Sequence, residues 1–315
     1  MKLDNLDVRE KDFGTTLALI RGTAGVMQEM GYKVGGFRVT ISSSVLRGSG
    51  LSSSAAFEVL IAAILDGLYN GFIVDAKTRA VIAQKVENGD CGKPCGLMDQ
   101  SAISLGGVSM IDFENVENPF VLGVQYPFTD TDIVITNTGG NHADLTSDYA
   151  AIRAEMEEVS EKFSEKYLRL VDYQKFLDAI PALQNEVSGR AIMRAIHFFD
   201  ENLRVDKAVS AINMKNADAF YKIVGESGDS SFKLLQNCYV PADTVQRIPL
   251  GIVLSQHVTG VKAVRVHGGG FAGTIIAFVE KAETHEYVEH MSEVFGADHV
   301  YKLSIRQEGA CRVEF

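Results

Sequence analysis

The stretch "SVLRGSGLSSSAAFEVLIAAIL", residues 44–65, constrains the fold more than any other part of the sequence. Its second half is apolar on nearly every side of a helix, which predicts a buried core helix over residues 54–68. Such a helix holds its N-terminus rigidly. The first N–H groups of a helix have no intrahelical partner, and the helix dipole makes that end positive. The glycines and serines that precede the helix are therefore placed where an anion can bind.

Two interpretations of this glycine–serine loop stay open from the residues alone. Gly48 and Gly50 let the backbone turn tightly and approach a ligand closely, and the hydroxyls of residues 52–54 can bind phosphate oxygens or ligate Mg²⁺. Alternatively, serine is a favoured N-cap residue, and the loop is a surface turn. The stretch is not a P-loop of the Walker type, because no lysine follows the glycines.

A second glycine loop, "RVHGGGFAGT", lies between two apolar segments that resemble strands. Gly268, Gly269 and Gly270 are consecutive and cost conformational entropy on folding. One interpretation is a bulged hairpin. The other is a loop that presses against a phosphate site, where the missing side chains leave room for the ligand.

Two carboxylates lie between these loops, in "VENGDCGKPCGLMDQ". Glu87 falls near the end of a predicted helix, and Asp99 follows a loop rich in glycine and proline. A carboxylate can ligate Mg²⁺ or act as a base toward a hydroxyl. Either residue can equally be a surface charge, and His142 and His267 are read as ordinary hydrogen-bonded residues.

The net charge of the chain, −11 over 315 residues, argues against a general nucleic-acid binder. No apolar run reaches the length that a membrane span needs, and "MKLDNLDVREKDFG" lacks the apolar core of a signal peptide. We therefore expect a cytoplasmic protein. Its four cysteines are expected to be reduced thiols: Cys91, Cys95, Cys238 and Cys311.

Hydrophobic periodicity predicts a mixed α+β front half and a helix-rich back half that strands close. The expected helices are 14–32, 54–68, a helix after Asp75 as N-cap, several across 145–254, and 284–295. The expected strands are 37–41, 107–113, 132–138, the two segments flanking the second glycine loop, 300–305 and 311–315.

Taken together and in this order, the motifs resemble the GHMP kinase superfamily and, within it, the galactokinases. "GSGLSSSAAFEV" is similar to the ATP phosphate loop, and "RVHGGGFAGT" is similar to the third motif of the superfamily. "VENGDCGKPCGLMDQ" resembles the galactokinase segment around the catalytic aspartate. "TNTGGNHADLTSDYAAIRAEM" resembles the stretch that carries a sugar-contacting tyrosine. The resemblance covers the chain from about Gly35 to its C-terminus.

The resemblance implies an ATP-dependent, Mg²⁺-dependent sugar kinase that makes galactose 1-phosphate. Asp99 would be the catalytic base or orienting anion, Ser54 and Glu87 would ligate Mg²⁺, and Gly96 and Tyr149 would line the sugar site together with Asp99. The residues implied to hold ATP are Gly48, Ser49, Gly50, Leu51, Ser52, Ser53, Ser54, Gly268, Gly269 and Gly270.

The resemblance also implies a two-domain α+β fold. Residues 1–130 would form the N-terminal domain, similar to ribosomal protein S5 domain 2 with a left-handed crossover and truncated at its front. Residues 131–315 would form a ferredoxin-like C-terminal domain, with the site between the two. The implied partners are the sugar and ATP, with no nucleic acid and no membrane, and a monomer is favoured.

The sequence departs from the galactokinase pattern in several places. Galactokinases carry a signature of the type "GRxNxxGEHxDY", which supplies a catalytic arginine, and the residues before Gly48 do not contain it, so we expect this chain to be a poor catalyst or inactive. Leu46, His267 and Ala272 stand where the pattern commonly has proline, threonine and glycine. "SSFKLLQNCYVP", residues 230–241, replaces a run with an acidic pair. Two other functions remain open: a non-catalytic galactokinase-like sensor of sugar and ATP, and a GHMP kinase for another small alcohol.

Overall fold

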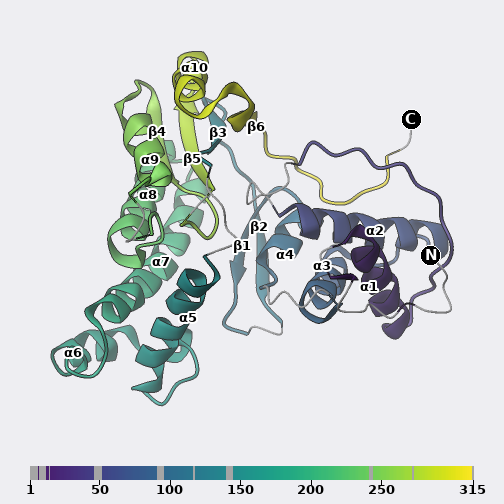
Figure 1. The fold of residues 1–315 in the computed structure, drawn as a ribbon, viewed down its shortest axis with the longest axis horizontal. Coiled ribbons are helices and arrows are strands. Elements are labelled where there is room, and N and C mark those ends of the chain that lie inside the picture. The colour runs from purple at the N-terminus through teal and green to yellow at the C-terminus, as the bar shows by residue number, and fades with distance from the viewer. Residues whose placement is uncertain are drawn as a thin grey trace. The chain divides into compact units, whose positions relative to one another are not determined.

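The chain forms two compact units in the computed structural model (Figure 1). The first contains residues 1–111 and 305–315, and the second contains residues 112–304. The structure describes residues 6, 12–13, 15–45, 52–90, 96–115, 118–139, 145–240, 244–271 and 273–313. Each unit has its own hydrophobic core. The expected division into domains at residue 130 stays a prediction.

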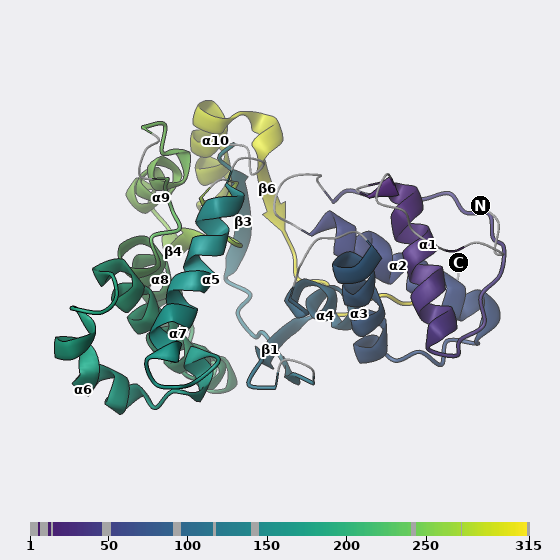
Figure 2. The ribbon, with the colours of Figure 1, turned by 60° about the horizontal axis from the view of Figure 1, so that its bottom comes forward.

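The first unit is built on helices that pack around an apolar core (Figure 2). Its elements are α1 (Thr16–Glu29), α2 (Ser53–Tyr69), α3 (Ala76–Lys85), the π-helix η2 (Val86–Asp90), α4 (Met98–Leu105) and β1 (Val108–Asp112). Met27, Ile61 and Ile82 of α1, α2 and α3 are fully buried and belong to one cluster. The predicted core helix is therefore confirmed, and Asp75 caps α3 by accepting a hydrogen bond from the Thr78 N–H.

The strand predicted at residues 37–41 is wrong. Residues 33–44 form neither helix nor strand, and Val39 and Ile41 are 42% and 37% exposed. Phe37 does pack against the α1–α3 core. A strand needs a neighbouring strand for its backbone hydrogen bonds, and none of the described strands pairs with this segment. The described part of the strand predicted at 311–315 is likewise not a strand.

The second unit contains an antiparallel sheet in the order β4-β5-β3-β6. Its strands are β3 (Thr131–Asn137), β4 (Val261–Val266), β5 (Thr274–Glu280) and β6 (Val300–Leu303); β2 (Phe120–Val124) precedes them. In the centre of the sheet, Ile135 lies opposite Ile276 on one side and Tyr301 on the other. The predicted strands 107–113, 132–138 and 300–305 are thus confirmed within a few residues, as are those flanking the glycine loop.

Helices cover both faces of this sheet (Figure 1). The helices of the unit are α5 (Thr146–Glu161), η3 (Leu168–Leu170), α6 (Tyr173–Leu183), α7 (Gly189–Asn213), α8 (Ala217–Ser230), η4 (Ser231–Leu235), α9 (Arg247–His257), α10 (Thr284–Phe295) and η5 (Ala297–His299). Ile275 and Ala277 pack with α9 and α10, whereas the alternate residues Ile276 and Phe278 pack with α8. The helical region predicted at 145–254 is confirmed. None of the described helices is long and apolar enough to cross a membrane.

Candidate functional site

The N-terminus of α2 has the properties of an anion site. Ser52 occupies its N-cap position with a left-handed backbone, φ 53° and ψ 49°, an uncommon conformation for serine. Among the described residues, no side chain caps this end of the helix. The N–H groups of the first turn and the positive end of the helix dipole are therefore available to an anionic ligand. Gly48, Ser49, Gly50 and Leu51 lie outside the described residues.

The predicted catalytic carboxylate lies next to this helix end. Asp99 is half-buried in the first turn of α4, and its Oδ2 accepts a hydrogen bond from the Ser52 hydroxyl. The two residues are 47 positions apart in the sequence, so the fold brings the glycine–serine loop and the carboxylate segment together. Gly96, the predicted sugar-site glycine, is exposed just before α4.

Ser54 and Glu87, the two predicted Mg²⁺ ligands, are also in contact. The Ser54 hydroxyl donates to Glu87 Oε1 over 2.7 Å, and the Gln100 amide donates to Glu87 Oε2 over 2.8 Å. Glu87 is only 4% exposed and lies in the π-helix η2, a distortion that is frequent at functional sites. Gln100 is a site residue that was not predicted from the sequence, although its position beside Asp99 in α4 was a usable signal.

The donor set suits a cation that keeps part of its own hydration shell. A serine hydroxyl and a carboxylate side by side are hard oxygen donors, as Mg²⁺ prefers, and Mg²⁺ usually takes only one or two protein ligands plus phosphates and water. In the described part of the chain, no group of three or more His, Cys, Asp or Glu side chains could hold a metal alone. These residues fit Mg²⁺ bound together with a phosphate ligand.

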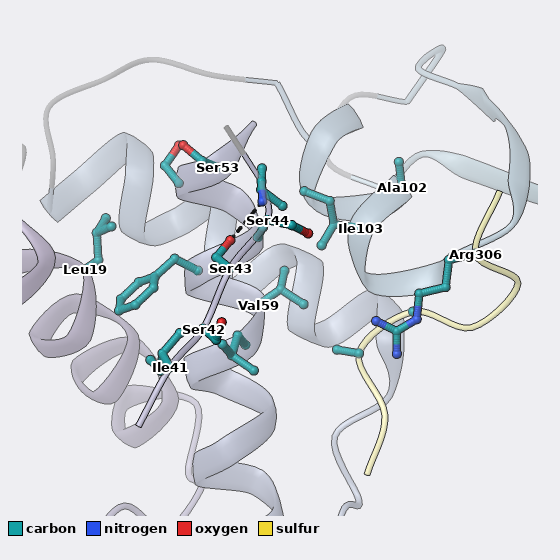
Figure 3. Close-up of a pocket in the computed structure, with 18 of the residues that line it drawn as sticks. Leu19, Ile41, Ser42, Ser43, Ser44, Ser53, Val59, Ala102, Ile103 and Arg306 are labelled. Atoms are coloured by element: carbon teal, nitrogen blue, oxygen red, sulfur yellow. Dashed lines mark hydrogen bonds between the residues drawn. The ribbon is translucent and has the colours of Figure 1, made fainter. Parts of the chain in front are cut away.

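A cavity of about 1170 Å³ opens in the first unit beside the first turn of α2 (Figure 3). Ser53 and Ser54 form part of its wall, and Arg306 and Glu308 contribute one cationic and one acidic residue to the lining. Apolar side chains form much of the rest: Leu19, Val39, Ile41, Phe57, Val59, Leu60 and Ile103. The cavity is large enough for a nucleotide-sized ligand next to the candidate anion site.

The second glycine loop connects β4 and β5 in the second unit. These strands pair antiparallel, so the loop is a hairpin connection, and their register shift lies at Val261/Ala263, away from the loop. Gly268 and Gly270 have φ of +71° and +84°, which other residues rarely adopt. A Cβ at Gly270 would also lie 2.1 Å from the backbone oxygen of Asn237. Glycine at position 270 is therefore required by both conformation and close packing.

Tyr149 contacts this loop. It lies in the first turn of α5, and its hydroxyl donates to the Gly270 carbonyl over 2.6 Å. Its ring meets Phe271 edge-to-face, with centroids 5.2 Å apart. Burial raises the pKa of Tyr149 above its usual value, so the hydroxyl stays protonated and remains a donor. His267 donates its backbone N–H to Thr274, whereas His142 lies outside the described residues.

Asn237 contacts the glycine loop and was not predicted from the sequence. Its side-chain amide donates to the Gly269 carbonyl over 3.0 Å, and its backbone oxygen accepts from the Phe271 N–H. The two segments are 32 positions apart, and no local pattern in "LLQNCYV" signals the contact. Cys238 beside it is buried and, like exposed Cys311, is a free thiol; Cys91 and Cys95 lie outside the described residues.

The chain is similar to several known proteins. The family model described as "GHMP kinases N terminal domain" matches residues 18–107. A galactokinase of Clostridium tetani is 30% identical over 295 residues, which are 88% of this chain and 70% of that protein. A galactokinase of Homo sapiens is 31% identical over 283 residues, which are 87% of this chain and 67% of the human protein.

The fold has counterparts among solved structures. The galactokinase of Lactococcus lactis complexed with galactose superimposes with a TM-score of 0.81 at 25% identity, over 99% of this chain and 80% of that one. The L. major mevalonate kinase in complex with R-mevalonate superimposes with a TM-score of 0.59 at 14% identity, over 93% and 78% of the two chains. The second likeness shows a shared fold only.

Proposed function

Because the chain belongs to the galactokinase family of GHMP kinases, we propose that it transfers the γ-phosphoryl group of ATP to the anomeric hydroxyl of galactose. The observation that carries this proposal is the pairing of Ser52 with Asp99 and of Ser54 with Glu87. In these pairs, the candidate base contacts the N-cap residue of α2, and the candidate metal ligand contacts the second residue of the same helix. Phosphoryl transfer needs an oriented nucleophile, and it needs positive charge next to the phosphate oxygens to neutralise their negative charge.

Asp99 acts on the sugar hydroxyl. Its carboxylate accepts or orients the hydroxyl proton while the hydroxyl oxygen bonds to the γ-phosphorus. The bond between that phosphorus and the bridging oxygen breaks, and ADP leaves with the electron pair. Ser52 orients the Asp99 carboxylate, because its hydroxyl donates a hydrogen bond to Asp99 Oδ2. The other carboxylate oxygen, Oδ1, would then face the substrate hydroxyl.

The first turn of α2 binds the phosphates. Its N–H groups and dipole stabilise the charge that spreads over the γ-phosphoryl oxygens during transfer. Ser54 and Glu87 would hold Mg²⁺, which supplies further charge neutralisation on the phosphate oxygens when it is bound. Gln100 fixes the Glu87 carboxylate, so one carboxylate oxygen stays directed at Ser54. We also propose Gly268–Gly270 as ATP-binding residues, as the family resemblance implies.

A substrate panel tests the proposed function. ADP release is measured for galactose, glucose, mevalonate and homoserine at fixed MgATP. We expect galactose to give the highest kcat/KM by a wide margin. A higher kcat/KM for mevalonate or homoserine would assign the chain to another branch of the superfamily.

A further inference from the structure

Two side chains from different elements hold the glycine loop by adjacent carbonyls. The Asn237 amide donates to the Gly269 carbonyl over 3.0 Å, and the Tyr149 hydroxyl donates to the Gly270 carbonyl over 2.6 Å. The Phe271 N–H donates back to the Asn237 backbone oxygen. The loop is therefore fixed at three consecutive residues by α5 and by the segment that follows η4.

Steric contacts reinforce these hydrogen bonds. A Cβ at Gly269 would lie 2.7 Å from the Tyr149 ring, and a Cβ at Gly270 would lie 2.1 Å from the Asn237 backbone oxygen. Asn237 and Phe271 are 3% and 8% exposed. The loop backbone is thus pressed directly against both residues, with no room for a side chain between them.

The geometry of the peptide unit determines where the loop's N–H groups point. In a trans peptide the C=O and the following N–H point in opposite directions. Because the Gly269 carbonyl points at the Asn237 amide, the Gly270 N–H points away from it. The Gly270 N–H is therefore not used by the Asn237 amide and is a candidate donor to an anion.

A buried arginine ties the two holding elements together. Arg194 of α7 is 2% exposed; its Nε donates to the Leu235 carbonyl over 3.1 Å, and its guanidinium donates to Glu155 over 2.9 Å. Glu155 lies on α5 with Tyr149, and Leu235 ends η4 two positions before Asn237. Arg194 therefore fixes the spacing between Tyr149 and Asn237.

We propose that Tyr149 and Asn237 are positioning residues that clamp Gly268–Gly270 in the shape that binds ATP, and that Arg194 sets the clamp's spacing. The proposal rests on the proposed function, which assigns this loop to the nucleotide. It gives Tyr149 a role on the phosphate side of the reaction, beyond the sugar contact that the family resemblance implies. It also gives a role to Asn237, which lies in the segment where this sequence departs from the galactokinase pattern.

Steady-state kinetics of Tyr149→Phe and Asn237→Asp test the clamp. Tyr149→Phe removes one hydrogen-bond donor with little change in shape, and Asn237→Asp removes the amide donor and adds a negative charge beside the Gly269 carbonyl. We therefore expect the KM for ATP to rise about five- to tenfold for Tyr149→Phe and at least as much for Asn237→Asp. The KM for galactose is expected to stay within about twofold of the wild-type value. Tyr173→Phe and Asn202→Asp are matched controls, because they remove a hydroxyl donor to Asp200 and an amide donor to a helix carbonyl elsewhere in the unit. They should leave both KM values unchanged.

Hydrogen exchange gives a readout that needs no activity. The amides of residues 268–271 should exchange faster in Tyr149→Phe, Asn237→Asp and Arg194→Met than in the wild type. Arg190→Met is the control for Arg194, because Arg190 also pairs with Glu155 but is exposed and lacks the bond to Leu235. Unchanged loop exchange in all three variants would overturn the clamp.

The kinetic outcomes separate the alternatives. A higher KM for galactose with an unchanged KM for ATP in Tyr149→Phe would overturn the proposal and leave Tyr149 as a sugar contact. A lower Tm with neither KM changed would also overturn it, since that is a purely structural effect. Calorimetry of ATP binding to the wild-type chain is run in parallel. If the wild type binds no ATP, the proposed function is wrong, and the clamp has no nucleotide to act on. If the wild type binds ATP but the variants show no change in the KM for ATP, only the clamp is wrong.

Discussion

Glu87 and Asp99 are carboxylates of the same site with different surroundings. Glu87 is almost fully buried and accepts hydrogen bonds at both oxygens, from Ser54 and Gln100. Asp99 is half-buried and accepts one from Ser52. A fixed, buried carboxylate suits a metal ligand, whereas an accessible one can reach a substrate hydroxyl. The two roles assigned by resemblance are thus consistent with the local packing.

Replacing Glu87 by glutamine should weaken the response to Mg²⁺. The amide keeps the size of the side chain but removes the negative charge, so we expect the Mg²⁺ concentration for half-maximal activity to rise at least about tenfold. The measurement is an Mg²⁺ titration of kcat at saturating ATP and sugar. Glu186→Gln, at an exposed glutamate paired with Lys162, serves as the control. An unchanged titration for Glu87→Gln would remove Glu87 from the metal site.

At the scale of elements, the sequence predicts helices better than strands. The limits of α2 and α10 follow from apolar residues at helical spacing, a signal contained within each segment. Apolar and polar residues also alternate clearly at 37–41, but a strand depends on hydrogen bonds to a partner strand elsewhere in the chain. The candidate site was predicted only in part for the same reason. Its motifs are local stretches of sequence, whereas the pairing of Ser52 with Asp99 and the contact of Asn237 with the glycine loop join residues that are far apart in the chain.

Two glycines of α8 should respond oppositely to alanine. A Cβ at Gly225 meets nothing within 4 Å, so Gly225→Ala should raise the free energy of unfolding by about 1 kcal/mol through helix propensity. A Cβ at Gly228 would lie 2.8 Å from Arg265 Cβ and 2.9 Å from the Val264 oxygen. Gly228→Ala should therefore destabilise the chain by about 1–3 kcal/mol, because α8 must move away from β4. Urea unfolding of both variants measures this, and equal shifts would contradict the packing of α8 on the sheet.

At the scale of the whole molecule, a partly buried polar network joins α7, α8 and β4. His197 Nδ1 lies 2.9 Å from the Ser230 hydroxyl, which also accepts from Arg204. Glu201 accepts from Arg204, and Arg265 reaches Glu201 within 3.6 Å. Burial lowers the pKa of His197 to about 4. The nearby Glu201 raises this pKa by a smaller amount, whereas Arg204 and Arg265 lower it further. The histidine is therefore neutral in the folded chain at neutral pH.

This pKa makes the stability of the chain fall in weak acid. The unfolded histidine takes up a proton near pH 6.5, whereas the folded one does so only near pH 4. Stability is thus lost as the pH falls between these values, by at most about 3 kcal/mol from this group. His197→Gln should flatten that part of the profile of unfolding free energy against pH, and exposed His285→Gln should not. A profile for His197→Gln that is as steep as the wild type would contradict the assignment.

The most direct test of the account is a single-turnover reaction of the 315-residue chain with ATP, Mg²⁺ and galactose. Enzyme in excess over galactose reveals transfer even when turnover is slow, and ³¹P NMR identifies the product. The account predicts galactose 1-phosphate from the wild type and a rate about 10²–10⁴-fold lower from Asp99→Asn, which loses the carboxylate's action on the hydroxyl. A wild-type chain that binds ATP and galactose but forms no sugar phosphate, or an Asp99→Asn variant as fast as the wild type, would contradict it.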